Sequence, residues 1–290
     1  STMVCSSSIL LNSIALISIL NNAVSFSIKT TRISQLSHTR NLLHYGPLPL
    51  NMATDNDSDD DSGLRFIGKL THKTEPAPLP STGKSINEFF ELKESCSVLL
   101  KGAGNNEVTP LDNPPAIVRE RWAKEAKRTG SQPPGPDDDI VEVKTAGISF
   151  PGLKVSSIAK IGTNLVLPND DNGSPEWQAT LIMDETKPEG LRPIVWIYNK
   201  LTGAAKEKTA DDQTVHSLSR ATAEVSGEEV VFMLEANLEV DLKIPKILLK
   251  ILPVNKEKAE KQGSEAIQKT LEKDIVPAMT NFREEYIKYL

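Results

Sequence analysis

VVFMLEANLEVDLKI, the segment from Val230 to Ile244, alternates apolar and polar side chains along most of its length. Its even positions are all apolar, whereas the odd positions from Glu235 to Lys243 are polar. A period of two residues predicts a β-strand with one buried face. Fifteen residues at about 3.3 Å each give a strand of about 50 Å, well above the usual length. We therefore expect the strand to bend around another element.

The segment after this strand predicts what the strand bends around. Residues 245–253 (PKILLKILP) form an apolar stretch with a proline at each end, and apolar residues then recur at helical spacing as far as Leu290. They are Ile267, Leu271, Ile275, Ala278, Phe282, Tyr286 and Tyr289. This spacing predicts a long amphipathic helix. Pro277 should kink it, which would let the helix follow a curved sheet.

Upstream of residue 230 the period-two pattern recurs in shorter runs. We expect strands over 90–100, 140–145, 153–167, 176–184, 194–199 and 213–225, separated by turn clusters such as 169–173 and 187–190. Between the first two strands, AIVRERWAKEAKR (residues 116–128) predicts a charged helix that ends at Gly130, with Trp122 as its anchor on the sheet. The predicted fold class is α+β, with a curved antiparallel sheet of about seven strands that grips the C-terminal helix.

Composition limits the classes of function. The chain has 290 residues, a formal net charge of −6 and 38% hydrophobic residues. The charge argues against a nucleic-acid partner, and the hydrophobic content is too low for a polytopic membrane protein. The two cysteines, Cys5 and Cys96, offer no disulfide framework, and we expect Cys96 to be a buried apolar residue.

The N-terminal residues read as a targeting sequence. No Asp or Glu occurs before Asp55, and residues 9–20 form an apolar run of signal-peptide length. Ala23-Val24-Ser25 resembles a cleavage site, and a Ser- and Thr-rich stretch without acids follows Phe26. We interpret residues 1–25 as a signal peptide and 26–54 as a transit-like segment. Secretion, or a cytosolic protein that starts at Met52, are the alternatives.

Residues 55–85 combine an aspartate run (DNDSDDDS) with a proline-rich stretch (EPAPLPSTGK). Neither stretch carries enough apolar surface to offset the entropy of ordering it. We therefore predict a disordered tether over 55–85 and a single folded domain over 86–290.

The order of strand, helical insertion, meander and long helix resembles the START-like, or SRPBCC, helix-grip fold. Residues 238–290 also resemble the DUF1997 family of cyanobacteria and plastids, in the alternating strand, the proline-bounded segment, Gly263 and the closing FREEY motif. That family often ends in an Asp-Tyr-x-x-Trp-like motif, whereas this chain reads Glu285-Tyr-Ile-Lys-Tyr289. The N-terminus resembles the plastid presequence of algae with secondary plastids. These resemblances imply a plastid protein, in the stroma or on the stromal face of the thylakoid, with a cavity between sheet and helix.

The sequence offers little catalytic chemistry. We find no metal-ligand spacing, nucleophile elbow, P-loop or dinucleotide motif, so we expect no enzyme, no catalytic or metal-ligating residue and no cofactor. His216 is the one histidine inside the predicted domain. Alternation places it on the solvent face of its strand, beside Arg220 and Glu224. The inverse assignment would direct all three into the cavity.

The remaining candidates are apolar. Large side chains on one face of the expected strands and helix predict a cavity for an apolar small molecule or lipid, with a filled core as the alternative. They are Trp177, Leu181, Met183, Trp196, Tyr198, Phe232, Leu234, Ile275 and Phe282. A second set predicts a patch that contacts a thylakoid membrane or a protein partner: Ile247, Leu248, Leu249, Ile251 and Leu252. We expect noncatalytic binding of a lipid, tetrapyrrole or carotenoid. The alternatives are an assembly partner of a photosystem and a cavity enzyme.

Overall fold

The computed structural model describes residues 63–80, 83–102, 106–136, 138–144, 148–150, 153–168, 173–202, 215–243 and 255–290. The predicted signal peptide, the transit-like segment and the first eight residues of the predicted tether lie outside these ranges.

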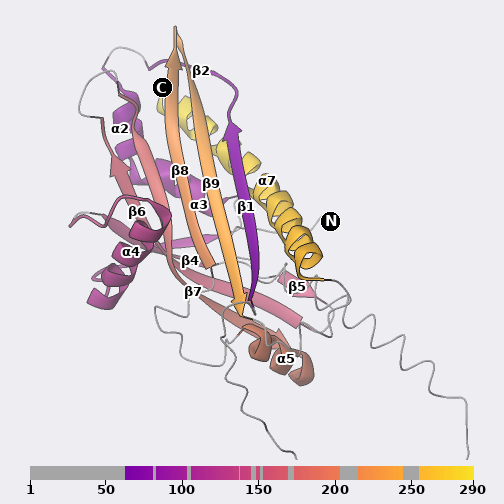
Figure 1. Cartoon of the computed structure of the whole chain (residues 1–290). Coiled ribbons are helices and arrows are strands. Elements are labelled where there is room, and N and C mark those ends of the chain that lie inside the picture. Colours follow the sequence, from indigo (N-terminus) through magenta and orange to yellow (C-terminus); the bar gives the residue numbers. More distant parts are fainter. Residues whose placement is uncertain are drawn as a thin grey trace, which may run out of the picture.

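The described residues form one antiparallel sheet of nine strands, in the order β1-β9-β8-β7-β6-β4-β3, with β2 on β9 and β5 on β6 (Figure 1). The strands are β1 (Gly63–Lys73), β2 (Ala77–Pro78), β3 (Glu107–Pro110), β4 (Asp139–Lys144), β5 (Ile148–Phe150), β6 (Leu153–Val166), β7 (Glu176–Gly190), β8 (Val215–Ser226) and β9 (Glu229–Lys243). The helices are α2 (Ile86–Glu91), α3 (Lys93–Lys101), α4 (Ala116–Thr129), α5 (Arg192–Thr202) and α7 (Lys256–Tyr289). The predicted α+β helix-grip architecture is confirmed, with nine strands where seven were expected.

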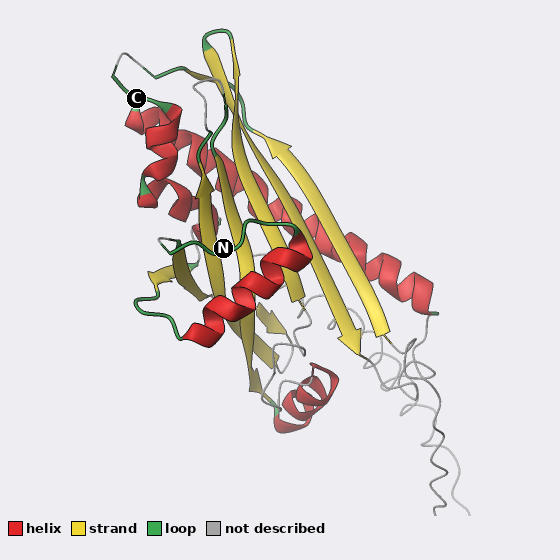
Figure 2. Cartoon of the chain, turned by 60° about the vertical axis from the view of Figure 1, so that its left-hand side comes forward, coloured by secondary structure: helices red, strands yellow, loops and turns green. Residues whose placement is uncertain are grey.

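Two layers of helix cover the two faces of the sheet. The long helix α7 lies along one face, and α4 crosses the other (Figure 2). The even positions of β9 predicted to be buried, from Val230 to Val240, are indeed buried. The strand pattern therefore identified the inner face, which packs against α7.

The prediction of a disordered tether is wrong for residues 63–80, which include the strands β1 and β2. Residues 63–73 form β1, which pairs with β9 over its whole length, and Leu64 and Phe66 lie in the core. The sequence GLRFIGKLTHK alternates buried and exposed residues, which is the pattern of a strand with one buried face. We overlooked it because an aspartate run precedes it and prolines follow it.

Strand β1 is an edge strand whose free side is closed by α7. The backbone N–H groups of alternate residues 65, 67 and 69 donate to the side chains of Glu260, Ser264 and Gln268, over 3.0, 3.0 and 3.3 Å. Four residues of a helix span about 6 Å, and two residues of a strand span about 6.8 Å. Every second N–H group of β1 therefore meets every fourth side chain of α7. An edge strand would otherwise present unpaired N–H groups to other chains.

Two glycines let α7 approach β1 this closely. A Cβ at Gly263 would lie 2.3 Å from Cδ1 of Phe66, and a Cβ at Gly68 would lie 2.2 Å from Cγ2 of Ile267. Real Cβ atoms do not approach neighbours to these distances. The absence of a side chain at both positions therefore sets the spacing between helix and sheet.

The predicted first strand, 90–100, is helical instead. Ser85 and Glu88 form a capping box that starts α2, and α3 follows from Lys93. Leu92, between the two helices, is extended; Phe89 and Phe90 are the buried residues of α2, and Ser95 and Cys96 are those of α3. The apparent alternation therefore combined the buried residues of two short helices.

An aromatic cluster joins α2, β9 and the end of α7. Its rings are those of Phe89, Phe90, Phe232, Phe282, Tyr286 and Tyr289. The ring centroids of Phe232 and Tyr286 are 4.9 Å apart, and the Tyr286 hydroxyl donates to the Pro78 carbonyl over 3.0 Å. Burial, with the nearby Tyr289, raises the pKa of Tyr286 to about 12. Tyr286 therefore lies in the core, and Tyr289 is half-buried against it.

The predicted turn at 187–190 and the strand at 194–199 are also wrong. Strand β7 runs on through Pro188 to Gly190, paired with β6, and α5 begins directly afterwards. Pro193 stands in the first turn of α5, where its missing N–H leaves no helical bond unmade. Gly190 has φ 149°, a backbone conformation that suits glycine and ends the strand.

The prediction of a helix with a tryptophan anchor is confirmed. Helix α4 runs from Ala116 to Thr129 and ends at Gly130 in the left-handed conformation. Trp122 is fully buried, and a Cβ at Gly162 of β6 would lie 2.2 Å from its ring. The absence of a side chain at Gly162 therefore leaves room for the indole ring on the outer face of the sheet.

Candidate functional site

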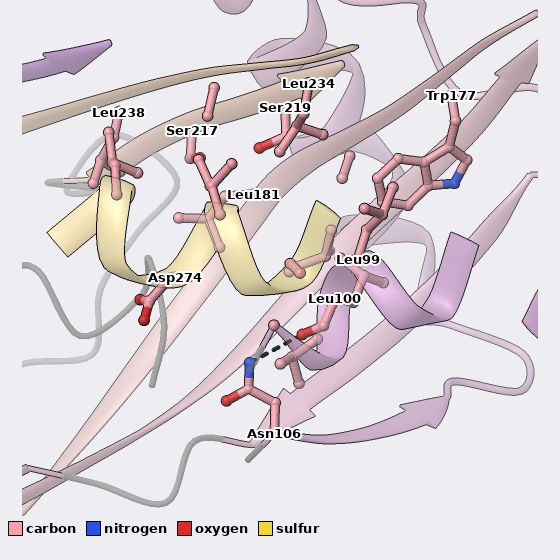
Figure 3. A pocket seen from close by; sticks show the side chains of 18 residues that line it. Leu99, Leu100, Asn106, Trp177, Leu181, Ser217, Ser219, Leu234, Leu238 and Asp274 are labelled. Atoms are coloured by element: carbon pink, nitrogen blue, oxygen red, sulfur yellow. Dashed lines mark hydrogen bonds between the residues drawn. The ribbon is translucent and has the colours of Figure 1, made fainter. Parts of the chain in front are cut away.

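A cavity of about 80 Å³ lies between the inner face of the sheet and α7 (Figure 3). The sheet contributes alternate residues of five strands, α7 contributes residues one turn apart, and α3 closes one end. The lining residues are Leu99, Leu100, Gly102, Asn106, Val143, Ile161, Trp177, Ala179, Leu181, Ser217, Ser219, Leu234, Ala236, Leu238, Leu271, Asp274, Ile275 and Ala278. Most of the lining is apolar.

Four side chains give this cavity a polar component. Ser217 and Ser219 project from β8, Asp274 comes from α7, and Asn106 donates from Nδ2 to the Leu100 carbonyl over 2.9 Å. Asp274 is buried, with 5% of its surface exposed. A few polar groups in an apolar wall are typical of small-molecule sites, where they orient the ligand.

A larger cleft of about 370 Å³ adjoins the cavity, between α2–α3 and strands β3, β4, β6 and β7. Its walls include Phe90, Val141 and Leu165, and at its rim Nζ of Lys93 lies 2.8 Å from Oδ2 of Asp139. Leu100 and Trp177 line both spaces. These two side chains therefore form the partition between the cavity and the cleft.

Four of the nine predicted cavity residues line the cavity. They are Trp177 and Leu181 on β7, Leu234 on β9 and Ile275 on α7. Period-two and helical spacing were sufficient to find them, because each element faces the cavity with a regular repeat.

Three other predicted cavity residues lie elsewhere. Phe232 and Phe282 fill the core inside the aromatic cluster and do not line the cavity. Met183 lies on the opposite face, where Nη1 of Arg121 from α4 approaches its Sδ to 3.9 Å. A β-bulge is the cause: Lys160 pairs with Met183 but Ile161 pairs with Leu181, so β7 has one extra residue and its alternation inverts there.

The predictions for Trp196 and Tyr198 assumed a strand and are wrong on that point, since both belong to α5. Trp196 is 62% exposed and does not line the cavity. The side chain of Tyr198 lies outside the described part of the structure, as does the predicted contact patch Ile247, Leu248, Leu249, Ile251 and Leu252.

Several lining residues were missed by the sequence analysis. Ala236 and Leu238 share the even register of Leu234, and Ser217 and Ser219 share the inner face of β8 with Ala221. Asp274 lies between the apolar positions 271 and 278 of the helix, so its helical position indicated burial. Leu99 and Leu100 were hidden by the wrong strand assignment.

The prediction that His216 faces solvent is wrong. Its Nδ1 lies 2.7 Å from Oε2 of Glu125 on α4, and each side chain is 5% exposed. The strand register was correct, since His216 lies on the outer face, but α4 covers that face. The inverse assignment also fails, because Arg220 pairs with Glu176 and Glu224 pairs with Lys73 outside the cavity.

Cys96 is buried, as predicted, and burial raises the pKa of its thiol to about 12. Among the described residues, no three His, Cys, Asp or Glu side chains gather in a group that could hold a metal ion. Within those same ranges, no helix has both the length and the apolar character needed to cross a membrane.

No protein family model and no curated protein sequence matches the chain. Solved structures that resemble it include the ZhuI aromatase/cyclase from Streptomyces sp. R1128, with a TM-score of 0.37 and 9% identity over 76% of this chain and 96% of that one. A norcoclaurine synthase point mutant from Thalictrum flavum gives 0.29 and 14%, over 72% and 96%. Major latex-like protein 151 from Panax ginseng gives 0.28 and 12%, over 69% and 97%.

Proposed function

We propose that this protein binds an amphipathic ligand, without catalysis, in the space between the sheet and α7. The observation that carries the proposal is the pair of adjoining spaces with a common partition of Leu100 and Trp177. The inner space is mostly apolar, and the outer space has an ion pair at its rim. A ligand with an apolar end in the inner space and a polar end at the rim of the outer space fits this arrangement.

The volumes narrow the ligand class. A cavity of 80 Å³ is far below the roughly 300–1,000 Å³ of sites for drug-sized ligands. The cleft of 370 Å³ falls inside that range. Of the three expected classes, a lipid chain that passes between Leu100 and Trp177 fits better than a tetrapyrrole or a carotenoid, because a chain is narrow enough to cross the partition.

The proposal predicts a bound mass after exposure to lipids. The full chain is incubated with a total plastid lipid and pigment extract, repurified and examined by native mass spectrometry. We expect one discrete added mass in the range of a single-chain lipid. A bare protein mass would contradict the proposed function.

A cavity-filling variant locates the ligand. Ala236→Leu adds three carbons to the inner cavity, and at about 0.8 kcal/mol per displaced CH₂ it should weaken binding by more than about tenfold. Ala116→Leu, at an exposed position of α4, is the matched control and should bind normally. Equal binding by both variants would place the ligand outside the cavity.

We further propose that the protein works in a plastid. Support comes from the N-terminal sequence and from the resemblance to DUF1997, for which no family model match was found. Residues 1–54 fused to a fluorescent protein should enter the plastid of an alga with a secondary plastid. The same fusion without residues 1–51, so that it starts at Met52, should stay in the cytosol. Secretion of the first fusion would contradict this location. A thylakoid or photosystem contact through residues 247–252 stays a prediction.

A further inference from the structure

A separate cleft, of about 290 Å³, lies on the outer face of the sheet, the face that α4 crosses (Figure 2). Strands β1, β8 and β9 form its floor, and Arg128 and Thr129 at the end of α4 form one wall. Ile67 and Leu218 give the floor an apolar part. Because the sheet separates this cleft from the cavity beside α7, a ligand here is distinct from the ligand of the proposed function, and the two can fail separately.

The buried histidine of this cleft has a nitrogen without a partner. His216 lines the cleft with 5% of its surface exposed, and its Nδ1 lies 2.7 Å from Oε2 of Glu125. Within the described ranges, Nε2 is buried and has no hydrogen-bond partner. With the proton of the neutral ring on Nδ1, facing the carboxylate, Nε2 is an acceptor. Buried polar atoms are nearly always paired, so a donor from a ligand would complete this site.

Two more polar side chains of the cleft are available to a ligand. Lys69 and Asn237 lie directly opposite each other on β1 and β9. In the part of the chain that the structure describes, Lys69 makes no ion pair and the Asn237 side chain makes no hydrogen bond. An ammonium and an amide both donate to a carboxylate. Two residues along the strands, about 6.8 Å away, lie His216 and Glu239.

The remaining charges at the cleft are already paired. Oε1 of Glu239 lies 2.6 Å from Nη2 of Arg65 and 3.1 Å from Nη2 of Arg128. Nη2 of Arg128 also lies 3.0 Å from Oδ2 of Asp241. Helix α4 ends at this cleft, so the partial negative charge of its last carbonyl groups lies on this side. Among the described residues, Lys69 is thus the unpaired cation of the cleft, and the end near α4 favours a positive group.

We propose that this cleft binds a small zwitterion, an α-amino acid with an aliphatic side chain. The carboxylate accepts hydrogen bonds from Lys69 and Asn237. The ammonium lies near the end of α4 and donates to Nε2 of His216. Because Nε2 is covered, binding includes a small rotation of the ring toward the cleft. Ile67 and Leu218 contact the aliphatic side chain.

A phosphate fits this cleft less well than an amino acid. Phosphate sites use the N-terminus of a helix, whereas α4 presents its C-terminus here. Arg128, a residue type that binds phosphate strongly, already pairs with two carboxylates. The volume also suits a small molecule, since 290 Å³ is close to the lower end of the roughly 300–1,000 Å³ of ligand pockets.

Analogues that lack one charge test the proposal. The full chain is labelled with ¹⁵N in its histidine rings and titrated with L-valine, isovalerate, isobutylamine and inorganic phosphate. Isovalerate lacks the ammonium of valine, and isobutylamine lacks its carboxylate. We expect L-valine to shift the Nε2 resonance of His216 and to bind at least about fivefold more tightly than either analogue, because each analogue loses a charge-assisted hydrogen bond. Binding of any of the other three as tightly as L-valine would overturn the proposal. So would an unchanged His216 resonance at the highest concentration of L-valine.

Substitutions assign the two ends of the ligand. Lys69→Gln removes the cation from an exposed position and should weaken L-valine binding at least about fivefold. His216→Asn keeps an N–H for Glu125 and removes Nε2, so it should weaken binding of L-valine but not of isovalerate. Lys73→Gln is the matched control and should bind normally, because Lys73 lies on the same face of β1 but pairs with Glu224 outside the cleft. Unchanged binding of L-valine by Lys69→Gln would overturn the proposal, whether or not His216→Asn folds.

Discussion

A chain that begins at residue 75 is expected not to fold, whereas a chain that begins at residue 63 should unfold at the same temperature as the full protein. The shorter chain lacks β1, and with it the buried side chains of Leu64 and Phe66. Losing buried leucine and phenylalanine side chains costs about 2–5 and 3–5 kcal/mol. Together these losses approach the whole stability of a typical domain, about 5–15 kcal/mol.

The loss also exposes backbone. Strand β9 would become the edge of the sheet, and Glu260, Ser264 and Gln268 on α7 would lose the N–H donors of β1. A long edge with a buried face is a site for aggregation. Thermal unfolding and gel filtration of both chains test this prediction. A cooperative transition at an unchanged temperature in the chain from residue 75 would show that β1 is dispensable.

Gly263→Val is expected to destabilise the protein by at least about 2 kcal/mol, because the new side chain collides with Phe66 in a fully packed interface. For a domain of this size such a loss lowers the unfolding temperature by about 4–8 °C. The cost should exceed the small gain that replacing glycine brings to a helix. Denaturant titration gives the free energy of unfolding directly.

Two further variants attribute the effect to the contact. Gln262→Val changes the exposed neighbour in the same helix and should alter stability by less than about 0.5 kcal/mol. Phe66→Leu combined with Gly263→Ala should be more stable than the sum of the two single changes predicts. Strict additivity would mean that Gly263 and Phe66 do not determine the approach of α7 to β1.

The apolar repeat of the sequence predicted an element correctly where the repeat is long enough to define the element without knowledge of what packs against it. The long alternation from Val230 and the helical repeat from Ile267 to Phe282 each identify an element and its buried face, because one face of each is continuously apolar. Two residues of the cavity wall, Leu234 and Ile275, followed from these two repeats, and Trp177 and Leu181 followed from the alternation of β7. The same reasoning failed for residues 90–100 and 194–199, where short apolar runs fit both a strand and a helix.

The sequence by itself determined the architecture: a curved antiparallel sheet, a long C-terminal helix and the side of β9 that the helix covers. Tertiary structure decided which residues line the cavity and which are hidden. Met183 changes face because a bulge shifts the register of β7 by one residue, and His216 is buried because α4 crosses the outer face. Trp196 is exposed on a helix because β7 continues to Gly190, paired with β6, and the chain then forms α5. Each outcome depends on a contact between residues distant in sequence, which no local repeat encodes.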